Sequence, residues 1–560
     1  MRFAEERLKI NGAVATWCMR NAARCRRRGR IEDALQWYQL SARVMACECV
    51  PLVSPELEKQ LVEIGAELET PERVFKAGLP RRWLHVLTEV REDGGHSAML
   101  KRWIQHDPQQ NAHSIALLSQ TVPVPSLLSE LTRSRNGEIH EIDGNQTITA
   151  KAGMLRDLVM NNADVVVLHT HPWDITPTVA LAQAGGPPVL LVNHAAHIFW
   201  VGVSVADVVL DCRVSQKEDE WTVRHRSVSK IMHLPLPLSE PYVSLAQKAE
   251  EARKFRDSLN IPLDAPVMLS VGIGNKYTPL EGANFIQLMR SVLEADQHAF
   301  LVVVGPQDNA HWEELRKHSG GRFILVEKQR DIAMPVFFQA ADLYLEGFPF
   351  GSTTACLEAA LAGLPCILPP VACPPPFTTD GIAMDLFERA ADISTYLERI
   401  HLLLNNREER LKCGERFSRS VRSHHCGTGW ARYLADIQKK LPDVHRVRSL
   451  HEQEHVDPVY SGYWTAFSAL INEDPLVSTF RLARSLGLSP KIDCKLFLCL
   501  LRHGSRGRKR GELPTWKLVS DTCVSYLIGM AKLVRRSWTT VRHGAATFCN
   551  GVSTKCPMEK

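Results

Sequence analysis

The 560-residue sequence predicts an α/β protein with two consecutive doubly wound parallel sheets, a helical N-terminal cap and a mostly helical C-terminal tail. Short apolar runs alternate with helical stretches twice along the chain, as in parallel sheets that are covered on both faces. A proline-rich bridge, HLPLPLSEP, separates the two sets of runs. The expected parts are a cap at 1–78, Rossmann-like domains at 79–240 and 241–440, and a basic extension at 441–560.

The cap is expected to be a helical hairpin. A basic turn, RCRRRGR at 24–30, precedes IEDALQWYQLSARVMA at 31–46, in which apolar residues recur at helical spacing. The pattern is similar to one degenerate tetratricopeptide-like unit. A single unit of this kind cannot bury its apolar face alone, so we expect it to dock on the sheet that follows.

Ten strands are expected in the two sheets. Those of the first sheet are Trp83–Val90, His113–Gln120, Asp164–Thr170, Pro187–His194 and Ala206–Arg213. Those of the second sheet are Val267–Ile273, Ala299–Gly305, Phe323–Glu327, Leu343–Leu345 and Pro365–Leu368. Helices are expected between them, at 97–105, 281–294 and 335–341, and again across 380–440.

The segment ADLYLEGFPFGSTTACLEAALAGLPCILPP, at 341–370, predicts a strand, a turn, a helix and a second strand. Ser352 is the expected N-cap, because its hydroxyl can accept a free amide of the first helical turn. Gly363 is expected to end the helix in the left-handed conformation. The start of such a helix attracts anions, because its first amides lack partners and carry partial positive charge.

Thr354 and Glu358 are four residues apart and therefore share one face of this helix. The threonine hydroxyl would lie near a phosphate, and the carboxylate could accept both hydroxyls of a ribose. The segment thus predicts a site for a nucleoside diphosphate. The alternative interpretation is an ordinary strand–helix unit in which Glu358 is merely solvated.

Composition narrows the class of protein. The length suggests three or four domains, and 45% hydrophobic with 23% charged residues is typical of a soluble globular protein. The first residues, MRFAEERLKI, lack an apolar signal core, and no apolar run is long enough to span a bilayer. The 15 cysteines show no zinc-ligand spacing, so reduced, mostly buried thiols in a cytoplasmic protein are expected.

Charge is concentrated in the tail. Residues 449–560 carry 16 Lys and Arg against 9 Asp and Glu, with a cluster, RHGSRGRKR, at 502–510. A patch for anionic phospholipid at the inner face of the membrane, or for a phosphorylated acceptor, is one interpretation. A solvated loop is the other. Nucleic acid is not an expected partner, because aromatic residues for base stacking are not interleaved with these charges.

Two such domains in tandem, with an anion-binding helix in the second, resemble a GT-B glycosyltransferase over roughly residues 80–440. EDGGHSAMLKRW, VVVLHTHPWD, LLVNHAAHIFW, VGIGNKYTPLEGANFIQLM and VEKQRDIAMPVFFQAADLYLE are similar to segments of glycosyltransferase family 4. The PFGSTT turn is closer to the family of O-linked N-acetylglucosamine transferases and bacterial protein glucosyltransferases.

The resemblance implies a donor site for a nucleotide-diphosphate sugar, used as a co-substrate without a further cofactor. The donor-binding residues that it implies are Gly94, Gly95, Gly274, Lys276, Lys328, Gln329, Gly351, Ser352, Thr353, Thr354 and Glu358. Family 4 pairs two glutamates eight residues apart, whereas Glu346 and Glu358 are twelve apart, so the sugar-contacting role does not carry over to Glu346. Family 4 retains anomeric configuration and the other family inverts it, so the stereochemistry stays open.

Ionisable side chains follow two predicted strands of the first domain, where an acceptor is expected to bind. His171 and His197 are the candidate bases, because a histidine that titrates near neutral pH can take a proton from a hydroxyl. The candidate acceptor-binding residues are His169, Trp173, Asp174 and His194. No metal-binding motif accompanies them, so no catalytic metal is expected.

The sequence therefore predicts a metal-independent glycosyltransferase of the hexosyltransferase type, acting on a glycan, glycolipid or protein. Lys276 is the expected catalytic cation, because the departing diphosphate must be stabilised. Two alternatives remain: a sugar-nucleotide epimerase on the same fold, and a scaffold without catalytic activity that binds protein. An epimerase would turn over the sugar nucleotide without an acceptor, and a scaffold need bind no nucleotide.

Overall fold

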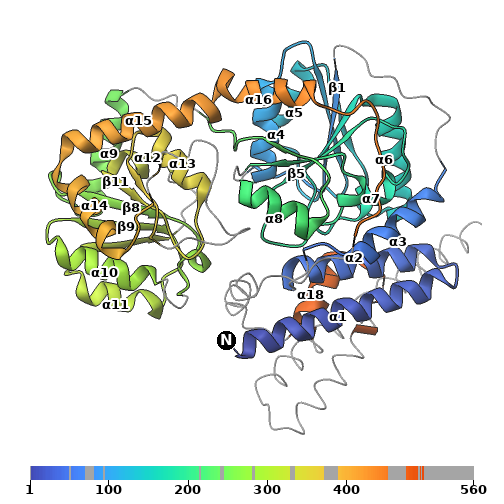
Figure 1. The fold of residues 1–560 in the computed structure, drawn as a ribbon, viewed down its shortest axis with the longest axis horizontal. Coiled ribbons are helices and arrows are strands. Elements are labelled where there is room, and N and C mark those ends of the chain that lie inside the picture. Colours follow the sequence, from blue (N-terminus) through green and yellow to red (C-terminus); the bar gives the residue numbers. More distant parts are fainter. Residues whose placement is uncertain are drawn as a thin grey trace, which may run out of the picture. The chain divides into compact units, whose positions relative to one another are not determined.

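The computed structural model describes residues 2–48, 52–69, 81–92, 95–212, 216–239, 245–279, 284–327, 334–370, 387, 389–451, 475–489, 492 and 495–496 (Figure 1). By its internal contacts the chain divides into two units, 1–471 and 472–560. Two parallel sheets lie in the first unit. In the second unit the described helix is α18 (Pro475–Ser485).

The first sheet has seven parallel strands in the order β3-β2-β1-β4-β5-β6-β7. Their bounds are β1 Arg82–Leu87, β2 Ala112–Leu117, β3 Ile139–Glu141, β4 Val165–Leu168, β5 Val189–Asn193, β6 Val208–Asp211 and β7 Ile231–His233. Strands β4, β5 and β6 are buried along their whole length, because helices cover both faces of the sheet. The two short edge strands, β3 and β7, were not expected.

The second sheet has five parallel strands in the order β10-β9-β8-β11-β12. Their bounds are β8 Val267–Val271, β9 Phe300–Gly305, β10 Phe323–Glu327, β11 Leu343–Leu345 and β12 Cys366–Ile367. All five were expected, each within two residues of its observed ends. In both sheets the chain builds outward from the first strand in one direction and then in the other, so the predicted class of two tandem doubly wound sheets is confirmed.

The helices lie between and around the strands (Figure 1). Their bounds in the first half of the chain are α1 Arg2–Arg26, α2 Ile31–Glu48, α3 Pro55–Ala66, α4 Gly95–His106, α5 Ser126–Ser134, α6 Ile148–Asn162, α7 Thr176–Ala180 and α8 Gln216–Arg226. Those that follow are α9 Leu245–Ser258, α10 Phe285–Ala295, α11 Glu313–His318, α12 Met334–Ala340, α13 Thr353–Leu361, α14 Ile393–Asn405, α15 Arg407–His425 and α16 Gly427–Lys439. Three 3-10 turns are η1 Val203–Val205, η2 Gly274–Tyr277 and η3 Ala310–Trp312.

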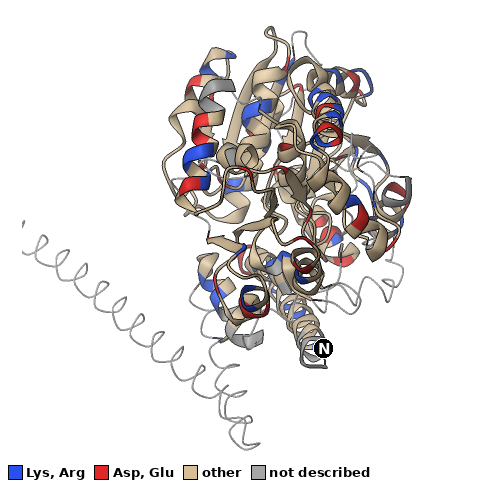
Figure 2. Ribbon diagram, turned by 90° about the vertical axis from the view of Figure 1, so that its left-hand side faces the viewer, with Lys and Arg blue, Asp and Glu red and all other residues tan. Residues whose placement is uncertain are grey.

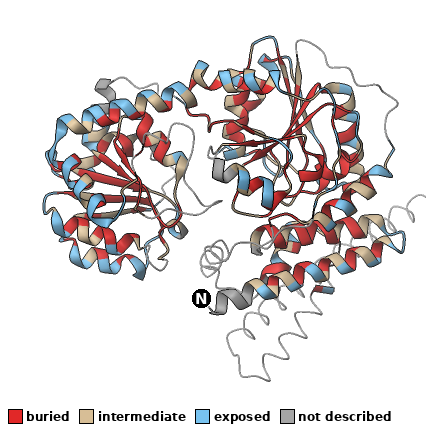
Figure 3. Cartoon of the chain, viewed as in Figure 1, coloured by how far each residue is buried: buried red, intermediate tan, exposed pale blue. Residues whose placement is uncertain are grey.

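Burial follows the layers. The strands and the inward faces of the helices are buried, whereas many of the charged residues belong to the helices around the sheets (Figures 2 and 3). One core joins β4, β5 and β6 to Trp103 of α4 and Trp430 of α16. The Nε1 of Trp430 donates to the carbonyl of Pro235 at 2.6 Å, so α16 packs on the first sheet although it follows the second sheet in sequence.

The eight cysteines that the structure describes in detail are free, and six of them are buried, in line with the expected reduced thiols. Within the described segments, no helix combines the length and the apolar character that crossing a bilayer requires. The basic cluster at 502–510 and most of the predicted helical tail lie outside the described residues.

Candidate functional sites at the strand ends

Each sheet has one point where the strand order reverses, between β1 and β4 in the first sheet and between β8 and β11 in the second. In doubly wound sheets ligands bind beyond the carboxyl ends of the strands at this point, because the loops there diverge. His96 lies in the first turn of α4, which follows β1, and His171 lies in the loop after β4. The loops after β8 and β11 carry Lys276 and Ser352. His171, Lys276 and Ser352 were predicted from the sequence, so predicted residues fall at both switch points, whereas His96 was not among the predicted residues.

At the switch point of the second sheet, two loops are joined directly. The Nζ of Lys276, in η2 after β8, donates to the carbonyl of Gly351, which follows β11. The amide of Phe350 donates back to the carbonyl of Lys276 at 3.4 Å. The structure thus brings the predicted cation to the start of α13. Its contact with a phosphate stays a prediction.

Glycines allow the backbone to pack closely beside this loop pair. A Cβ on Gly305, where φ is +111°, would lie 2.6 Å from the carbonyl oxygen of Gly272. A Cβ on Gly272 would lie 3.0 Å from the Oγ of Ser352, and one on Gly347 would lie 3.0 Å from the ring of Tyr277. The ends of β8, β9 and β11 therefore meet without room for side chains at these positions.

We expect Gly305→Ala to lower the free energy of unfolding by about 2–4 kcal/mol, since a positive φ and a backbone clash act together. The matched control is Gly320→Ala, because Gly320 has φ +58° but no atom within 4 Å of its Cβ position. The control should lose only about 1–2 kcal/mol, the cost of the backbone conformation. Denaturant unfolding measures both, and equal losses would show that the contact with Gly272 is unimportant.

The start of α13 differs from the expected capping. Ser352 occupies the N-cap position, so the predicted position is confirmed, but its side chain makes no capping hydrogen bond, so the predicted role of the hydroxyl is wrong. The backbone amide of Ser352 instead donates to the carboxylate of Glu346, six residues earlier. This bond uses the amide of the N-cap residue itself, whereas a capping serine hydroxyl would accept from an amide two or three residues further along the helix. At the other end, Gly363 has φ +94°, so the predicted left-handed stop is confirmed.

Glu346 is the residue at this site that sequence reasoning set aside. Its side chain is fully buried just beyond β11. Burial raises the pKa of Glu346 to about 7, against the opposing effects of the Ser352 amide and the Lys276 charge. One carboxylate oxygen, Oε2, makes no hydrogen bond of ordinary geometry, although the Tyr344 hydroxyl and the Cys356 thiol lie beside the carboxyl group. Glu346 is thus a buried acid at the helix start, poised to titrate near neutral pH.

Glu358 lies one turn after Thr354 on α13, as predicted. Thr354 is exposed, and Glu358 is partly buried. Burial raises the pKa of Glu358, and the Arg102 guanidinium of α4 acts in the opposite direction. Arg102 is itself fixed by hydrogen bonds to the carbonyl of Pro237 and to the Oγ of Ser239, at 3.0 Å for the latter. The ribose-binding role of Glu358 stays a prediction.

The first sheet gathers histidine rings at its switch point. The rings of His96, at the start of α4, and His194, after β5, stack with centroids 4.0 Å apart. The His171 ring lies 5.8 Å from that of His96 and 4.8 Å from that of Trp173. Arg43 of α2 lies over the Trp173 ring at 3.2 Å from its centroid, so the helical cap contacts this loop. Burial lowers the pKa of His96 to about 4 and that of His171 in the same direction.

Other predicted acceptor residues have structural partners. The carboxylate of Asp174 is buried and accepts from the Thr88 hydroxyl at 2.8 Å and the Thr176 amide at 3.1 Å. His169 is completely buried, so in this structure it has no surface to offer an acceptor. His197 is partly buried in the turn after β5. The roles assigned to these residues remain predictions.

Among the predicted donor residues, Gly95 is the exposed first residue of α4, and Gly274 is exposed at the start of η2. Gly94, Lys328 and Gln329 lie outside the described residues. Among the residues that the structure does describe, no group of three or more His, Cys, Asp or Glu side chains is arranged to hold a metal ion.

Sequence reasoning missed His85 and His113, which lie inside β1 and β2 and are fully buried. The sequence did contain a sign of this, because His85 shares one face of its predicted strand with the apolar residues Trp83 and Leu87. A polar residue at such a position must find a partner in the core. The predicted strands could therefore have suggested a buried polar row.

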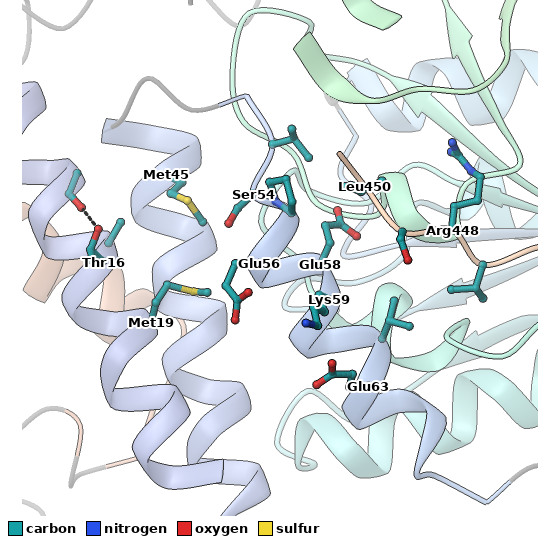
Figure 4. Close-up of a pocket in the computed structure, with 17 residues that line it drawn as sticks. Thr16, Met19, Met45, Ser54, Glu56, Glu58, Lys59, Glu63, Arg448 and Leu450 are labelled. Atoms are coloured by element: carbon teal, nitrogen blue, oxygen red, sulfur yellow. Dashed lines mark hydrogen bonds between the residues drawn. The ribbon is translucent and has the colours of Figure 1, made fainter. Parts of the chain in front are cut away.

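A cavity of about 860 Å³ lies elsewhere, in the helical cap, and has no part in either switch point (Figure 4). It is lined by α1, the end of α2, α3 and residues 447–450. The carboxylate of Glu58, on its wall, already accepts from the amides of Gly202, Val203 and Ser204. This carboxylate caps η1 and is therefore structural.

The fold and the paired switch points define the chain as an α/β protein with two tandem doubly wound domains. No protein-family model and no curated protein sequence matches it. Among solved structures, it is similar to an O-GlcNAc transferase mutant of Thermobaculum terrenum at 13% identity, over 78% of this chain and 84% of the transferase, with a TM-score of 0.47.

It is also similar to HepE of Anabaena in complex with UDP and glucose, at 11% identity over 64% of this chain and 100% of HepE, with a TM-score of 0.46. A third similar structure is the sucrose-phosphate synthase of Thermosynechococcus elongatus, at 14% identity over 64% of this chain and 99% of the synthase, with a TM-score of 0.43. Similarities at this level define neither a family nor an activity for this chain.

Proposed function

We propose that the protein is a glycosyltransferase that moves a hexose-type sugar from a nucleoside diphosphate sugar to a glycan, glycolipid or protein acceptor without a catalytic metal. The observation that carries the proposal is the start of α13. There, the Lys276 ammonium lies on the carbonyl of Gly351, at the switch point of a doubly wound sheet. A diphosphate at that place would meet a cation and unpaired helix amides together.

The chemistry follows from the leaving group. Breaking the bond between sugar and diphosphate leaves negative charge on the departing phosphate, and donors fixed beforehand stabilise that charge most effectively. The helix start supplies roughly 0.3–1 kcal/mol at an exposed site. Lys276 adds a full charge, whose effect grows as the site closes and excludes water.

The acceptor would bind at the first switch point, beside His96, His171 and His194. Burial lowers the pKa of all three imidazoles, so they are neutral near pH 7. A neutral imidazole can take the proton of an acceptor hydroxyl as it attacks the sugar. The peripheral contact of residues 502–510 with anionic membranes is part of the same proposal, because lipid-linked acceptors lie at such surfaces.

The proposal is tested by Glu358→Ala, which should weaken binding of a nucleoside diphosphate about tenfold by calorimetry, since a bidentate acceptor for the ribose is lost. The matched control is Glu415→Ala, because Glu415 is an exposed helical glutamate that pairs with Arg419 at the surface. The control should bind like the wild type.

Unchanged affinity in Glu358→Ala would remove the ribose role. If the wild type bound no nucleoside diphosphate at all, the scaffold alternative would replace the proposal. Turnover of a sugar nucleotide in the absence of acceptor would favour the epimerase instead.

Glu346 should make donor binding depend on pH. Its carboxylate holds the Ser352 amide beside Lys276, so a phosphate that arrives there competes with it. The pKa of Glu346 is raised to about 7, so the residue is neutral below pH 7 and repels a phosphate above it. We expect the affinity for a sugar nucleotide to fall about three- to tenfold from pH 6 to pH 8.5.

In Glu346→Gln this fall should disappear, because the amide does not titrate. A sugar nucleotide is the suitable ligand, since its diphosphate does not change charge over this range. Calorimetry at the two pH values measures the effect. The same dependence on pH in wild type and variant would show that Glu346 is not the titrating group.

A further inference from the structure

A row of hydrogen-bonded histidines crosses the core of the first sheet. The Oδ2 of Asp107 lies 3.1 Å from the Nε2 of His113, whose Nδ1 lies 3.1 Å from the Nε2 of His85. The Nδ1 of His85 lies 3.2 Å from the Nε2 of His169, whose Nδ1 lies 3.3 Å from the Nε2 of His194. Five ionisable groups are thus joined by four hydrogen bonds.

The row crosses four adjacent strands, β2, β1, β4 and β5. His113 and His85 lie within β2 and β1, whereas His169 and His194 directly follow the last residues of β4 and β5. Asp107, His113, His85 and His169 are buried, and only His194 is partly exposed. Burying one unpaired polar group is costly, so four imidazoles in a core need the hydrogen bonds that they make to one another.

One carboxylate determines the orientation of every bond in the row. Burial lowers the pKa of all four histidines, so each is neutral and has one donor nitrogen and one acceptor nitrogen. Because Asp107 can only accept, His113 must carry its hydrogen on Nε2 and accept on Nδ1. Each Nδ1 that accepts requires the Nε2 of the next ring to donate, so His85, His169 and His194 in turn must also carry their hydrogen on Nε2. All four are therefore Nε2–H tautomers.

The row ends where the acceptor is proposed to bind. His194 donates from Nε2 to His169, so its Nδ1 is left as the last acceptor nitrogen. The ring of His194 stacks on that of His96, which begins α4 at the switch point. The other end, Asp107, lies before the amino end of β2, on the opposite side of the sheet from the switch point. It lies after α4 and accepts from the Nδ2 of Asn111 at 2.7 Å and from the Nε2 of Gln438 of α16 at 2.9 Å.

We propose that this row is a proton relay that takes the proton of the acceptor hydroxyl at the Nδ1 of His194 and delivers it to Asp107. The inference rests on the proposed function. As the hydroxyl oxygen attacks the sugar, its O–H bond breaks and an N–H bond forms at the Nδ1 of His194. The Nε2 proton of His194 passes to His169, and the shift repeats through His85 and His113 until a proton reaches the Oδ2 of Asp107.

The relay is balanced, because each imidazole gains one proton and loses one, and no oxidant or co-reactant is needed. The charged and titratable groups that face it are few. Arg135 donates to the backbone carbonyl of Asp107 at 3.0 Å, and its charge acts on His113. His96 acts on His169 and His194. Trp83 and Trp103 pack against His85, so water is kept from the middle of the row.

The orientation can be tested on the intact wild-type protein by the ¹⁵N chemical shifts of its imidazoles, which distinguish the two neutral tautomers. We expect His85, His113, His169 and His194 to be Nε2–H at pH 7.5. An Nδ1–H tautomer in any of the four would overturn the relay, because one reversed bond interrupts it.

His85→Gln separates proton transfer from simple positioning. A glutamine can donate to His113 and accept from His169, so it can keep both hydrogen bonds, but an amide does not pass a proton along. We expect transfer of sugar to the acceptor to fall about 100-fold, the range of general-base catalysis. Asp107→Asn should lose a similar factor, since an amide cannot receive the proton.

The readout that separates this inference from the proposed function is binding of the nucleoside diphosphate, which both variants should keep at wild-type affinity. A folded His85→Gln or Asp107→Asn enzyme that transfers at the wild-type rate would overturn the relay and leave the proposed function standing. Loss of donor binding in the wild type would instead overturn the proposed function. If Asp107→Asn does not fold, His85→Gln and the tautomers decide.

Discussion

We expect the protein to lose roughly 3 kcal/mol of its free energy of unfolding between pH 6.5 and pH 5.5. Burial lowers the pKa of His85, His169 and His194 well below the usual value of 6.5. It lowers the pKa values of His96, His106, His113 and His171 in the same direction. Below pH 6.5 these histidines bind protons in the unfolded chain but stay neutral in the folded chain. The free energy of unfolding therefore falls as the pH falls.

Each such histidine contributes about 1 kcal/mol over this interval if its imidazole stays neutral in the folded state. Three glutamates act in the opposite direction, because burial raises the pKa values of Glu58, Glu346 and Glu358. These carboxyl groups bind protons more readily in the folded state than in the unfolded state, so their protonation stabilises the folded protein as the pH falls. The seven histidines outweigh the three glutamates, so a net loss of stability remains.

The measurement is denaturant unfolding at the two pH values, compared with His194→Gln. The glutamine amide can still donate to His169, so the row keeps its hydrogen bond while one titrating group is removed. The variant should lose about 1 kcal/mol less than the wild type over the interval. Replacing the exposed His401 of α14 is the control, and it should leave the loss unchanged. Equal losses in all three proteins would show that the buried row does not cause the effect.

The long apolar strands could be predicted because their periodicity and composition are local. VVVL in β4 and VLLVN in β5 are strands wherever they are buried. The edge strands β3 and β7 could not be predicted, since IHE and IMH carry no apolar run and depend on a neighbouring strand. The positions of Lys276 and Gly351 after strand ends could likewise be predicted from the succession of elements, whereas their proposed donor-binding role came from a family resemblance.

Residues whose roles depend on contacts between distant parts of the chain could not be predicted from local sequence patterns. Asp107 and His194 are separated in sequence by the intervening strands, and only the strand order places them at the two ends of one row. Glu346 was set aside because its spacing to Glu358 differs from a family pattern. Its carboxylate reaches the start of α13 because the turn between Glu346 and Ser352 folds back, which spacing alone does not reveal.

We expect Lys276→Ala to lower the rate of sugar transfer about 100- to 1,000-fold, the loss that follows removal of one donor to a developing anion. In the proposed reaction the departing diphosphate gains its charge in the transition state, so the rate should fall further than the affinity for the nucleoside diphosphate. The free energy of unfolding should fall by about 1.5–3 kcal/mol, since the charge-assisted hydrogen bond to Gly351 and the favourable charge beside Glu346 are lost.

Lys254→Ala is the matched control, because Lys254 is an exposed lysine of α9 that pairs with Glu250 at the surface. A pair of this kind contributes little, so the control should change stability by less than about 0.5 kcal/mol and leave transfer intact. Single-turnover rates, donor affinity and denaturant unfolding together decide the role of Lys276. A folded Lys276→Ala enzyme with the wild-type rate would contradict it. A fall in rate matched by an equal fall in donor affinity would mean that Lys276 holds the diphosphate equally in the ground state and the transition state.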